Sequence, residues 1–238
     1  MESEKDLGVT IDHNLNFDSH ICSKVKKANQ MFAMIRRSFK HLDIPTFVPM
    51  YKSLVRTHLD YAASVYHPYK KKHIDQLESV QRRATKQIPG MKELSYPERL
   101  RKLKLPTISY RRVRGDMIEL YKIINKIYDD SVTSFIEMWS DKAIRSSSRT
   151  HDKKLFPQHA KSLLRQNSFK VRTANTWNSL PEYIVNAPSL NSFKNRLDKL
   201  WQTQDLMYDD HKAPLASSTT GNRKRLEKTD RDSGGEAS

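Results

Sequence analysis

The feature that most constrains the fold of this chain is an amphipathic stripe between residues 73 and 90. Its apolar side chains recur at steps of three and four residues, which places them on one face of a helix. They are Ile74, Leu77, Val80, Ala84 and Ile88. Pro89-Gly90 follows directly and ends the helix. Acidic residues come early and basic residues late, which the helix dipole favours, so the stretch predicts a helix with a core side and a basic side.

Three consecutive lysines, Lys70, Lys71 and Lys72, stand just ahead of this helix. They lie at the positive end of the helix dipole, where cations are unfavourable. Because the stability of the helix does not require them, we expect them to serve an anionic partner.

Apolar residues with similar spacing predict further helices along the chain. Glycine is scarce, with 6 residues in 238, so we expect a mainly α fold, a helical bundle. Asp18 or Ser19 is the expected cap of the first helix, and Ser95 and Glu98 form a capping box for the fourth. The other helices are expected from Asp43 to about Ser64, from Thr107 to Tyr128, and from Ser189 to Trp201.

Short β elements are predicted at two places. Within Leu7–Asp12, apolar residues alternate with others and several side chains are β-branched, which is typical of a strand. No partner for this strand is evident in the chain. Residues 155–171 are expected to form a small hairpin. Residues 140–154 are polar and basic, which predicts an exposed loop, and the tail after residue 208 is expected to be disordered.

The chain carries 43 Lys and Arg against 27 Asp and Glu, a net charge of +16. From Asp209 onward, six basic residues balance six acidic ones, so the surplus belongs to residues 1–208, the part able to fold. A structured basic surface of this kind predicts binding to nucleic acid or to another anionic surface.

Several other classes of protein are disfavoured. The single Cys22 excludes an internal disulfide framework and any multi-cysteine zinc site. No apolar run approaches the roughly 20 residues that span a bilayer, and the charged start does not resemble a signal peptide. We therefore expect no membrane association, no secretion and an intracellular location, in the nucleus or the cytoplasm.

Motifs for catalysis or metal binding are weak. The nine histidines form no zinc signature, and His67 and His73 flank the lysine run without a carboxylate at ligand spacing. Tyr128-Asp129-Asp130 and Tyr208-Asp209-Asp210 lack the residue that separates the aromatic side chain from the aspartates in polymerase metal sites. We interpret both as solvated ends of helices, and expect no catalytic residue, metal or cofactor.

The basic residues are the candidate binding site. Cations on successive short helices can gather on one side of a bundle and meet phosphates at several points. The candidates are Lys24, Lys70, Lys71, Lys72, Arg82, Arg83, Lys86, Arg111, Arg112 and Arg114. The alternative is a set of separately solvated cationic faces.

Six blocks in a fixed order resemble the reverse transcriptases of non-LTR (LINE-type, jockey- and CR1-like) retrotransposons. Together they cover about residues 5–202, and their order and spacing are more specific than any single block. The blocks are Lys5–Asp12 through Ile21, Tyr51–Ala62, Leu77–Gly90, Leu105–Met117, Trp177–Pro181 and Phe193–Lys199.

The resemblance implies a position in such a polymerase, with the fingers, the palm and the catalytic aspartates missing. Residues 1–17 would be a remnant of the palm edge, residues 18–90 a thumb-like helical bundle, residues 91–202 a C-terminal helical extension and residues 203–238 a disordered tail. It implies a non-catalytic fragment that binds an RNA–DNA hybrid or other duplex through phosphates.

Three alternatives stay open. The fragment could be an interaction protein that binds an intact reverse transcriptase, or another protein, through the strand at Leu7–Ile11. It could be a remnant of a retroelement with no selected function. It could also be a separately encoded thumb subunit that supports polymerisation when fingers and palm are added in trans.

Overall fold

The computed structural model describes residues 3–39, 41–129, 131, 135–139, 151–203 and 207–208. It is mainly helical, as the sequence predicts, with one short antiparallel sheet at the N-terminus. The strands are β1 (Ser3–Asp6) and β2 (Val9–Asp12). The helices are α1 (Asp18–Ser38), α2 (Ile44–Met50), the π-helical turn η1 (Tyr51–Val55), α3 (Arg56–Asp60), α4 (Lys71–Lys86), α5 (Tyr96–Leu103), α6 (Ile108–Ile124), α8 (Leu163–Gln166), α9 (Phe169–Asn178), α10 (Glu182–Val185) and α11 (Leu190–Thr203).

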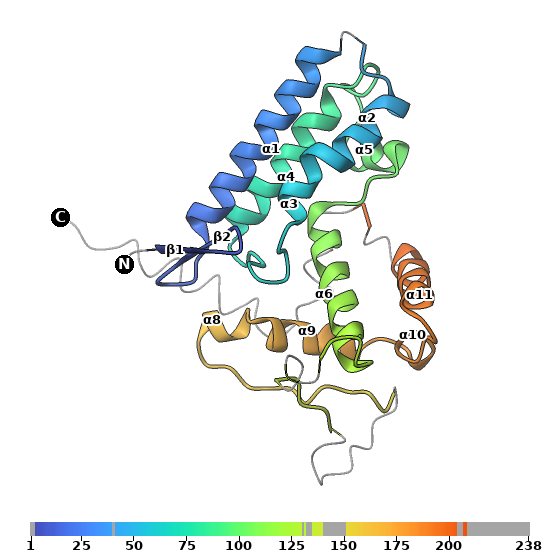
Figure 1. Ribbon diagram of the computed structural model, residues 1–238. Coiled ribbons are helices and arrows are strands. Elements are labelled where there is room, and N and C mark those ends of the chain that lie inside the picture. The colour runs from blue at the N-terminus through green and yellow to red at the C-terminus, as the bar shows by residue number, and fades with distance from the viewer. Residues whose placement is uncertain are drawn as a thin grey trace, which may run out of the picture.

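Figure 1 shows a bundle built around α1, α3 and α4, from which α6 leads to the part of the molecule that contains α9, α10 and α11. Two clusters of buried side chains correspond to these parts. The first core runs from Ile21 to Ile108, and the second core runs from Tyr110 to Trp201. The division falls within α6 and not at residues 90 and 91, because Met91, α5 and Leu105 pack into the first core.

The strand predicted at Leu7–Asp12 is present as β2, but the expectation that it has no partner is wrong. Leu7 and Gly8 form a two-residue turn with φ of 42° and 78°, and β2 pairs with β1 in the register Ser3 with Asp12 and Asp6 with Val9. The Tyr61 hydroxyl donates to the Leu7 carbonyl at 2.6 Å and anchors this turn. The strand of the proposed interaction role is therefore one half of a two-stranded sheet and not an orphan.

The expected cap of α1 is also wrong. Phe17 precedes the helix and provides no side-chain cap, and Asp18 lies in the first turn. Asp12 organises the entry instead, since its carboxylate accepts from the backbone N–H groups of Asn14, Asn16 and Phe17. Burial opposes ionisation of Asp12, but these N–H groups outweigh it and lower its pKa.

The helix predicted from Asp43 to Ser64 begins as expected and ends early. The Asp43 carboxylate accepts from the Thr46 N–H at 3.0 Å. Pro49 lies inside α2, where it has no N–H to donate, and the following residues form the wider π turn η1. The helix then ends at Asp60, two residues before Ala62 takes a left-handed φ of 51°.

The remaining local caps are confirmed. The Ser95 N–H donates to Glu98 Oε2 at 2.7 Å, and Thr107 Oγ1 accepts from the Tyr110 N–H at 3.1 Å. Ser189 Oγ likewise accepts from the Ser192 N–H. These hydrogen bonds span only three residues, so the sequence pattern is enough to find them.

The hairpin predicted over residues 155–171 is wrong. Leu155 forms an isolated bridge with Met138, and Phe169 begins α9. Residues 151–154 form a loop that is only partly exposed, since Asp152 is exposed while His151 is buried and the Lys153 carbonyl accepts from Trp177 Nε1. Residues 140–150 lie outside the described ranges.

Part of the predicted tail is folded. Helix α11 extends to Thr203, the Met207 carbonyl accepts from the Thr107 N–H at 3.0 Å, and Tyr208 packs against the first core. Met207 and Tyr208, which were expected in the tail, therefore contact the folded part of the chain. The aspartates that follow Asp129 and Tyr208 lie outside the described residues, as does the tail from 209 to 238.

Candidate nucleic-acid interface

Helix α1 brings two lysines against α3. Lys24 Nζ lies 5.0 Å from the centre of the Tyr61 ring. Burial lowers the pKa of His58, and the charges of Lys27 and Lys24 lower it further, so these cations lie close to His58. Lys24 was expected as a binding residue, whereas Lys27 was not singled out among the charges of this helix.

The lysine run occupies the start of α4. Lys70 is the N-cap residue, and Lys71 and Lys72 are exposed in the first turn. Lys70 Nζ lies 5.9 Å from the centre of the Tyr69 ring. Behind the run, His73 Nε2 lies against Asp18 Oδ1 of α1, so the helix is held by residues other than the lysines.

Three further cations, Arg82, Arg83 and Lys86, lie in the later turns of α4. Arg83 and Lys86 are exposed, as expected for the basic side of an amphipathic helix. Arg82 is half-buried: its guanidinium lies 5.5 Å from the centre of the Tyr96 ring and 3.9 Å from Asp75. Arg82 therefore bridges α4 and α5 as well as contributing charge.

The three arginines of α6 do not lie on the surface in the way the sequence suggests. Arg112 is 3 % exposed, and its Nη2 donates to the Leu59 carbonyl at 2.8 Å. Arg114 forms a two-pronged pair with Asp198 of α11, at 2.6 and 2.8 Å. We leave Arg112 and Arg114 out of the candidate interface, because Arg112 is buried and Arg114 uses both oxygens of the Asp198 carboxylate.

Arg111 is an intermediate case. Its Nε and Nη2 donate to Asp60 Oδ2 at 3.0 and 2.6 Å, and the side chain is 28 % exposed. Arg56 approaches the same oxygen at 3.5 Å. Arg111 thus belongs to a cluster on α3 and α6 that contains cations the sequence pattern did not single out.

The expected set therefore divides between different parts of the surface. Positions 24 and 27 lie on one side of α1, toward α3, while Cys22, Val25 and Asn29 lie on another side, in a groove with Gln76 of α4. Lys26 also lines this groove, so the cations of α1 lie on more than one side of the helix.

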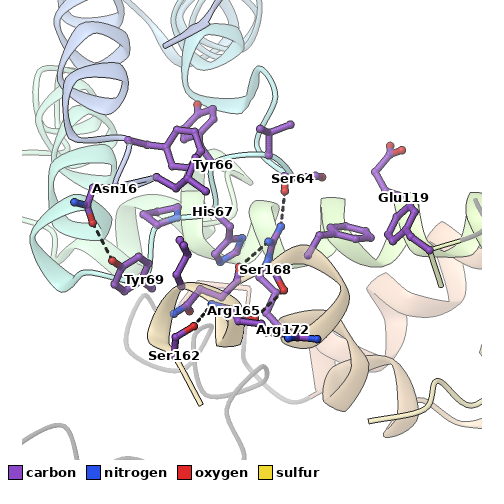
Figure 2. Close-up of a pocket in the computed structure, with 18 of the residues that line it drawn as sticks. Asn16, Ser64, Tyr66, His67, Tyr69, Glu119, Ser162, Arg165, Ser168 and Arg172 are labelled. Carbon is purple, nitrogen blue, oxygen red and sulfur yellow. Dashed lines mark hydrogen bonds between the residues drawn. The ribbon is translucent and has the colours of Figure 1, made fainter. Parts of the chain in front are cut away.

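A cleft of about 660 Å³ lies where the loops at residues 15–17 and 64–69 face α6, α8 and the start of α9 (Figure 2). Its lining is mostly apolar and aromatic, and includes Phe17, Tyr69 and Phe169. Arg172 Nη2 donates to the Ser64 carbonyl at 2.7 Å along one side. Sequence reasoning missed the cleft because separate segments of the chain supply its walls.

The polar groups at the cleft form an internal network. His67 Nδ1 lies 3.2 Å from Asp116 Oδ2, and Arg172 donates to both oxygens of that carboxylate at 3.0 Å. Burial would raise the pKa of Asp116, but His67 and Arg172 outweigh it and lower the pKa. The network joins the loop before α4 to α6 and α9.

Within the described residues, no group of three or more His, Cys, Asp or Glu side chains is placed to hold a metal ion. Cys22 is exposed and carries a free thiol. No helix in the described ranges combines the length and apolar character that a membrane crossing requires.

Comparisons with known proteins return no matching family model, no similar curated protein and no similar solved structure.

Proposed function

We propose that this chain binds duplex nucleic acid, such as an RNA–DNA hybrid, through phosphates and without base specificity. The observation that carries the proposal is the charge of residues 18–108, which hold 19 Lys and Arg against 7 Asp and Glu. Several of those acids are used locally: Asp43 and Glu98 cap helices, and Glu78 is buried. The charge that remains outside is therefore mainly positive.

The kind of cation favours phosphate binding over base recognition. Lys27, Lys71, Lys72 and Lys86 are exposed lysines on helices. An ammonium group on a flexible chain acts as a point charge toward phosphate, whereas base edges are most often recognised by two-pronged arginine or amide hydrogen bonds. We infer that the surface positions a duplex and does not read its sequence.

We further propose that the chain is a non-catalytic C-terminal part of a non-LTR retrotransposon reverse transcriptase. The ordered sequence blocks from Lys5 to Lys199 support this origin. In that setting, residues 18–90 would hold the template–primer duplex while another part of the polymerase carries the catalytic aspartates. An intact reverse transcriptase is then a further partner to test.

The test is a salt-titrated binding assay with an RNA–DNA hybrid, duplex DNA and single-stranded DNA. Binding to six phosphates would make the affinity fall roughly a thousandfold between 50 and 200 mM salt. Two hybrids of unrelated sequence should bind alike. An affinity for the hybrid that hardly changes with salt would contradict the proposal.

Two paired charge variants locate the surface. The double variant Lys71→Gln, Lys72→Gln removes two exposed cations from α4. The double variant Lys194→Gln, Lys199→Gln removes the same amount of charge from α11. The first pair should reduce the salt slope by about 0.9 for each phosphate that is no longer bound, and the second should leave it unchanged. Equal effects from both pairs would indicate a general attraction and not an interface.

A further inference from the structure

Two arginines from separate helices share a single carboxylate oxygen. Asp60 Oδ2 lies 2.6 Å from Arg111 Nη2 of α6 and 3.5 Å from Arg56 Nε of α3. The side chains of Arg56 and Arg111 are 14 % and 28 % exposed, so neither charge is fully solvated. One carboxylate can neutralise only one of the two guanidinium groups.

A third cation, Lys52, lies one turn before Arg56. Lys52 is exposed, and its pKa is lowered by partial burial and by the charges of Arg56 and Arg111. The pKa of Arg56 is also lowered, by burial and by Arg111, although Asp60 opposes this. Arg56 and Arg111 therefore share one carboxylate while Lys52 lies near both arginines, and the four groups together carry a net charge of about +2.

A second acid in this region, Glu78, is committed to a different task. It is buried, and its Oε2 accepts from the Ile108 N–H of α6 at 2.9 Å, while the Tyr96 hydroxyl donates to its other oxygen. The carboxylate of Glu78 therefore lies at the N-terminus of α6. Tyr51, whose pKa is raised by burial and by both Glu78 and Asp60, donates its hydroxyl hydrogen to Gln81 Oε1 at 3.0 Å.

The backbone that carries Lys52 and Arg56 is unusual. Lys52 lies within the π turn η1, and Arg56 directly follows it. Single π turns are rare and are frequent at functional sites. The exposed side of this segment also carries the short side chains of Ser53 and Thr57, and both hydroxyls donate to backbone carbonyls.

We propose that Lys52, Arg56 and Arg111 form a binding site for one phosphate group. Guanidinium groups donate charge-assisted hydrogen bonds to phosphate oxygens, and the lysine adds a charge that can follow the ligand. Asp60 is the internal counter-ion, and a bound phosphate would compete with it for the arginines. The assignment to a phosphodiester rests on the proposed function, whereas a free phosphate group would use the same chemistry.

Inorganic phosphate tests the site without nucleic acid. Thermal unfolding of the full chain is followed in sodium phosphate and in sodium chloride of equal ionic strength. We expect phosphate to raise the Tm by about 2–4 °C in the unmodified protein. Lys52→Gln and Arg111→Lys should abolish this rise, the second because Nε and Nη2 of Arg111 already donate to Asp60 and a lysine lacks the remaining guanidinium donors. Lys27→Gln, which removes a charge from α1, should keep it.

Binding to the hybrid then identifies the source of the phosphate. Lys52→Gln should weaken hybrid binding about three- to tenfold and reduce the salt slope by about 0.9, the value for one phosphate. Asp60→Asn should have effects of opposite sign, lowering the Tm without ligand while raising the affinity for the hybrid, because it removes the competing carboxylate. A purely structural Asp60 would lower the Tm and leave the affinity unchanged or weaker.

The outcomes separate this inference from the proposed function. Phosphate protection that depends on Lys52 and Arg111, in a protein that does not bind the hybrid, would support the site and contradict the proposed function. Salt-dependent hybrid binding that Lys52→Gln leaves unchanged, with no protection by phosphate, would overturn the site alone. Protection by phosphate with unchanged hybrid binding would assign the site to a free phosphate group.

Discussion

The two parts of the molecule use their carboxylates in different ways. Residues 18–108, around the first core, employ Asp43 and Glu98 as caps within their own helices and bury Glu78 beneath α6. Residues 110–201, around the second core, use Asp116 and Asp198 to bind the arginines Arg172 and Arg114 of other elements. Lysines such as Lys71, Lys72 and Lys86 stay exposed in the first part, whereas Arg114 and Arg172 of the second part are held in ion pairs.

The two parts differ more in how their cations are paired than in how many charges they carry. Residues 110–201 hold 17 Lys and Arg against 9 Asp and Glu, which is also a basic composition. Lys170 pairs with Glu137 and Lys122 with Glu119, in addition to the arginine pairs. A surplus of positive charge in the sequence therefore does not identify a binding surface until the partners of the cations are known.

The largest expected effect is at the ion pair that joins α6 to α9 within the second part. Asp116→Ala leaves Arg172 without its carboxylate in a site where both side chains are less than 10 % exposed. Removing one partner of such a buried pair destabilises a protein by about 3–5 kcal/mol. Urea unfolding followed by circular dichroism measures the change.

The second partner provides the control for that prediction. Adding Arg172→Met to Asp116→Ala should restore part of the stability, because it removes the unpaired charge. A destabilisation below about 1 kcal/mol, or no recovery in the double variant, would show that the pair does not hold α6 and α9 together.

A smaller effect is expected where the first part buries an acid. Glu78→Ala removes the acceptor for the Ile108 N–H and the Tyr96 hydroxyl, which joins α4 to α5 and α6. Hydrogen bonds to charged groups contribute about 1.5–3 kcal/mol, so we expect a destabilisation near 3 kcal/mol by urea unfolding. Glu93→Ala, at an exposed position before α5, is the matched control and should change stability by less than about 0.5 kcal/mol.

The pH dependence of the first part should follow His20. His20 is 1 % exposed and its Nδ1 accepts from the Thr10 N–H, so the fold requires the neutral ring. Burial, together with Lys24 and Arg112, lowers its pKa from 6.5 to about 4. Between those values the unfolded chain binds the extra proton, so stability is complete above pH 6.5 and decreases as the pH falls toward 4.

The expected size of this effect is about 2 kcal/mol between pH 6.5 and 4, measured by urea unfolding at several pH values. Nuclear magnetic resonance titration of the ring gives the pKa directly. A ring that titrates near 6.5 in the folded protein would show that His20 does not hold the β1–β2 hairpin as a neutral acceptor.

The smallest effect has the opposite sign. Leu7 is 83 % exposed and has a φ of 42°, in a turn where Asn and Gly are favoured. Leu7→Asn should therefore raise stability by about 0.5–1 kcal/mol, since it relieves backbone strain and removes no buried side chain. Leu163→Asn, on exposed α8, serves as the control for the change in polarity alone and should be nearly neutral.

Features built from neighbouring residues could be predicted. The helix at Lys71–Lys86, the cap at Asp43 and the capping box at Ser95 and Glu98 each depend on groups within about four residues of one another. Where local preference was ambiguous, prediction failed. Ser168–Val171 was predicted as a strand and contains the β-branched Val171. Ser168 instead precedes α9, which places Trp177 in the second core.

The candidate site was predictable only in part. Exposed lysines such as Lys71 and Lys72 lie where an amphipathic pattern puts them. Arg112 and Arg114 belong to the same cationic run in the sequence, yet one bonds to Leu59 and the other to Asp198, 53 and 84 residues away. The spacing of Lys52 and Arg56 is compatible with a shared face, but Arg111 joins them only through the packing of α3 against α6.

The sequence by itself determined where most of the helices lie, several of their caps, and that the folding part of the chain carries a surplus of positive charge. Helix formation and capping depend on short spacings, which the order of residues specifies directly. Only the tertiary structure decided which cations stay at the surface and which are neutralised inside. An ion pair forms where two distant segments meet, and that meeting depends on how the two cores pack.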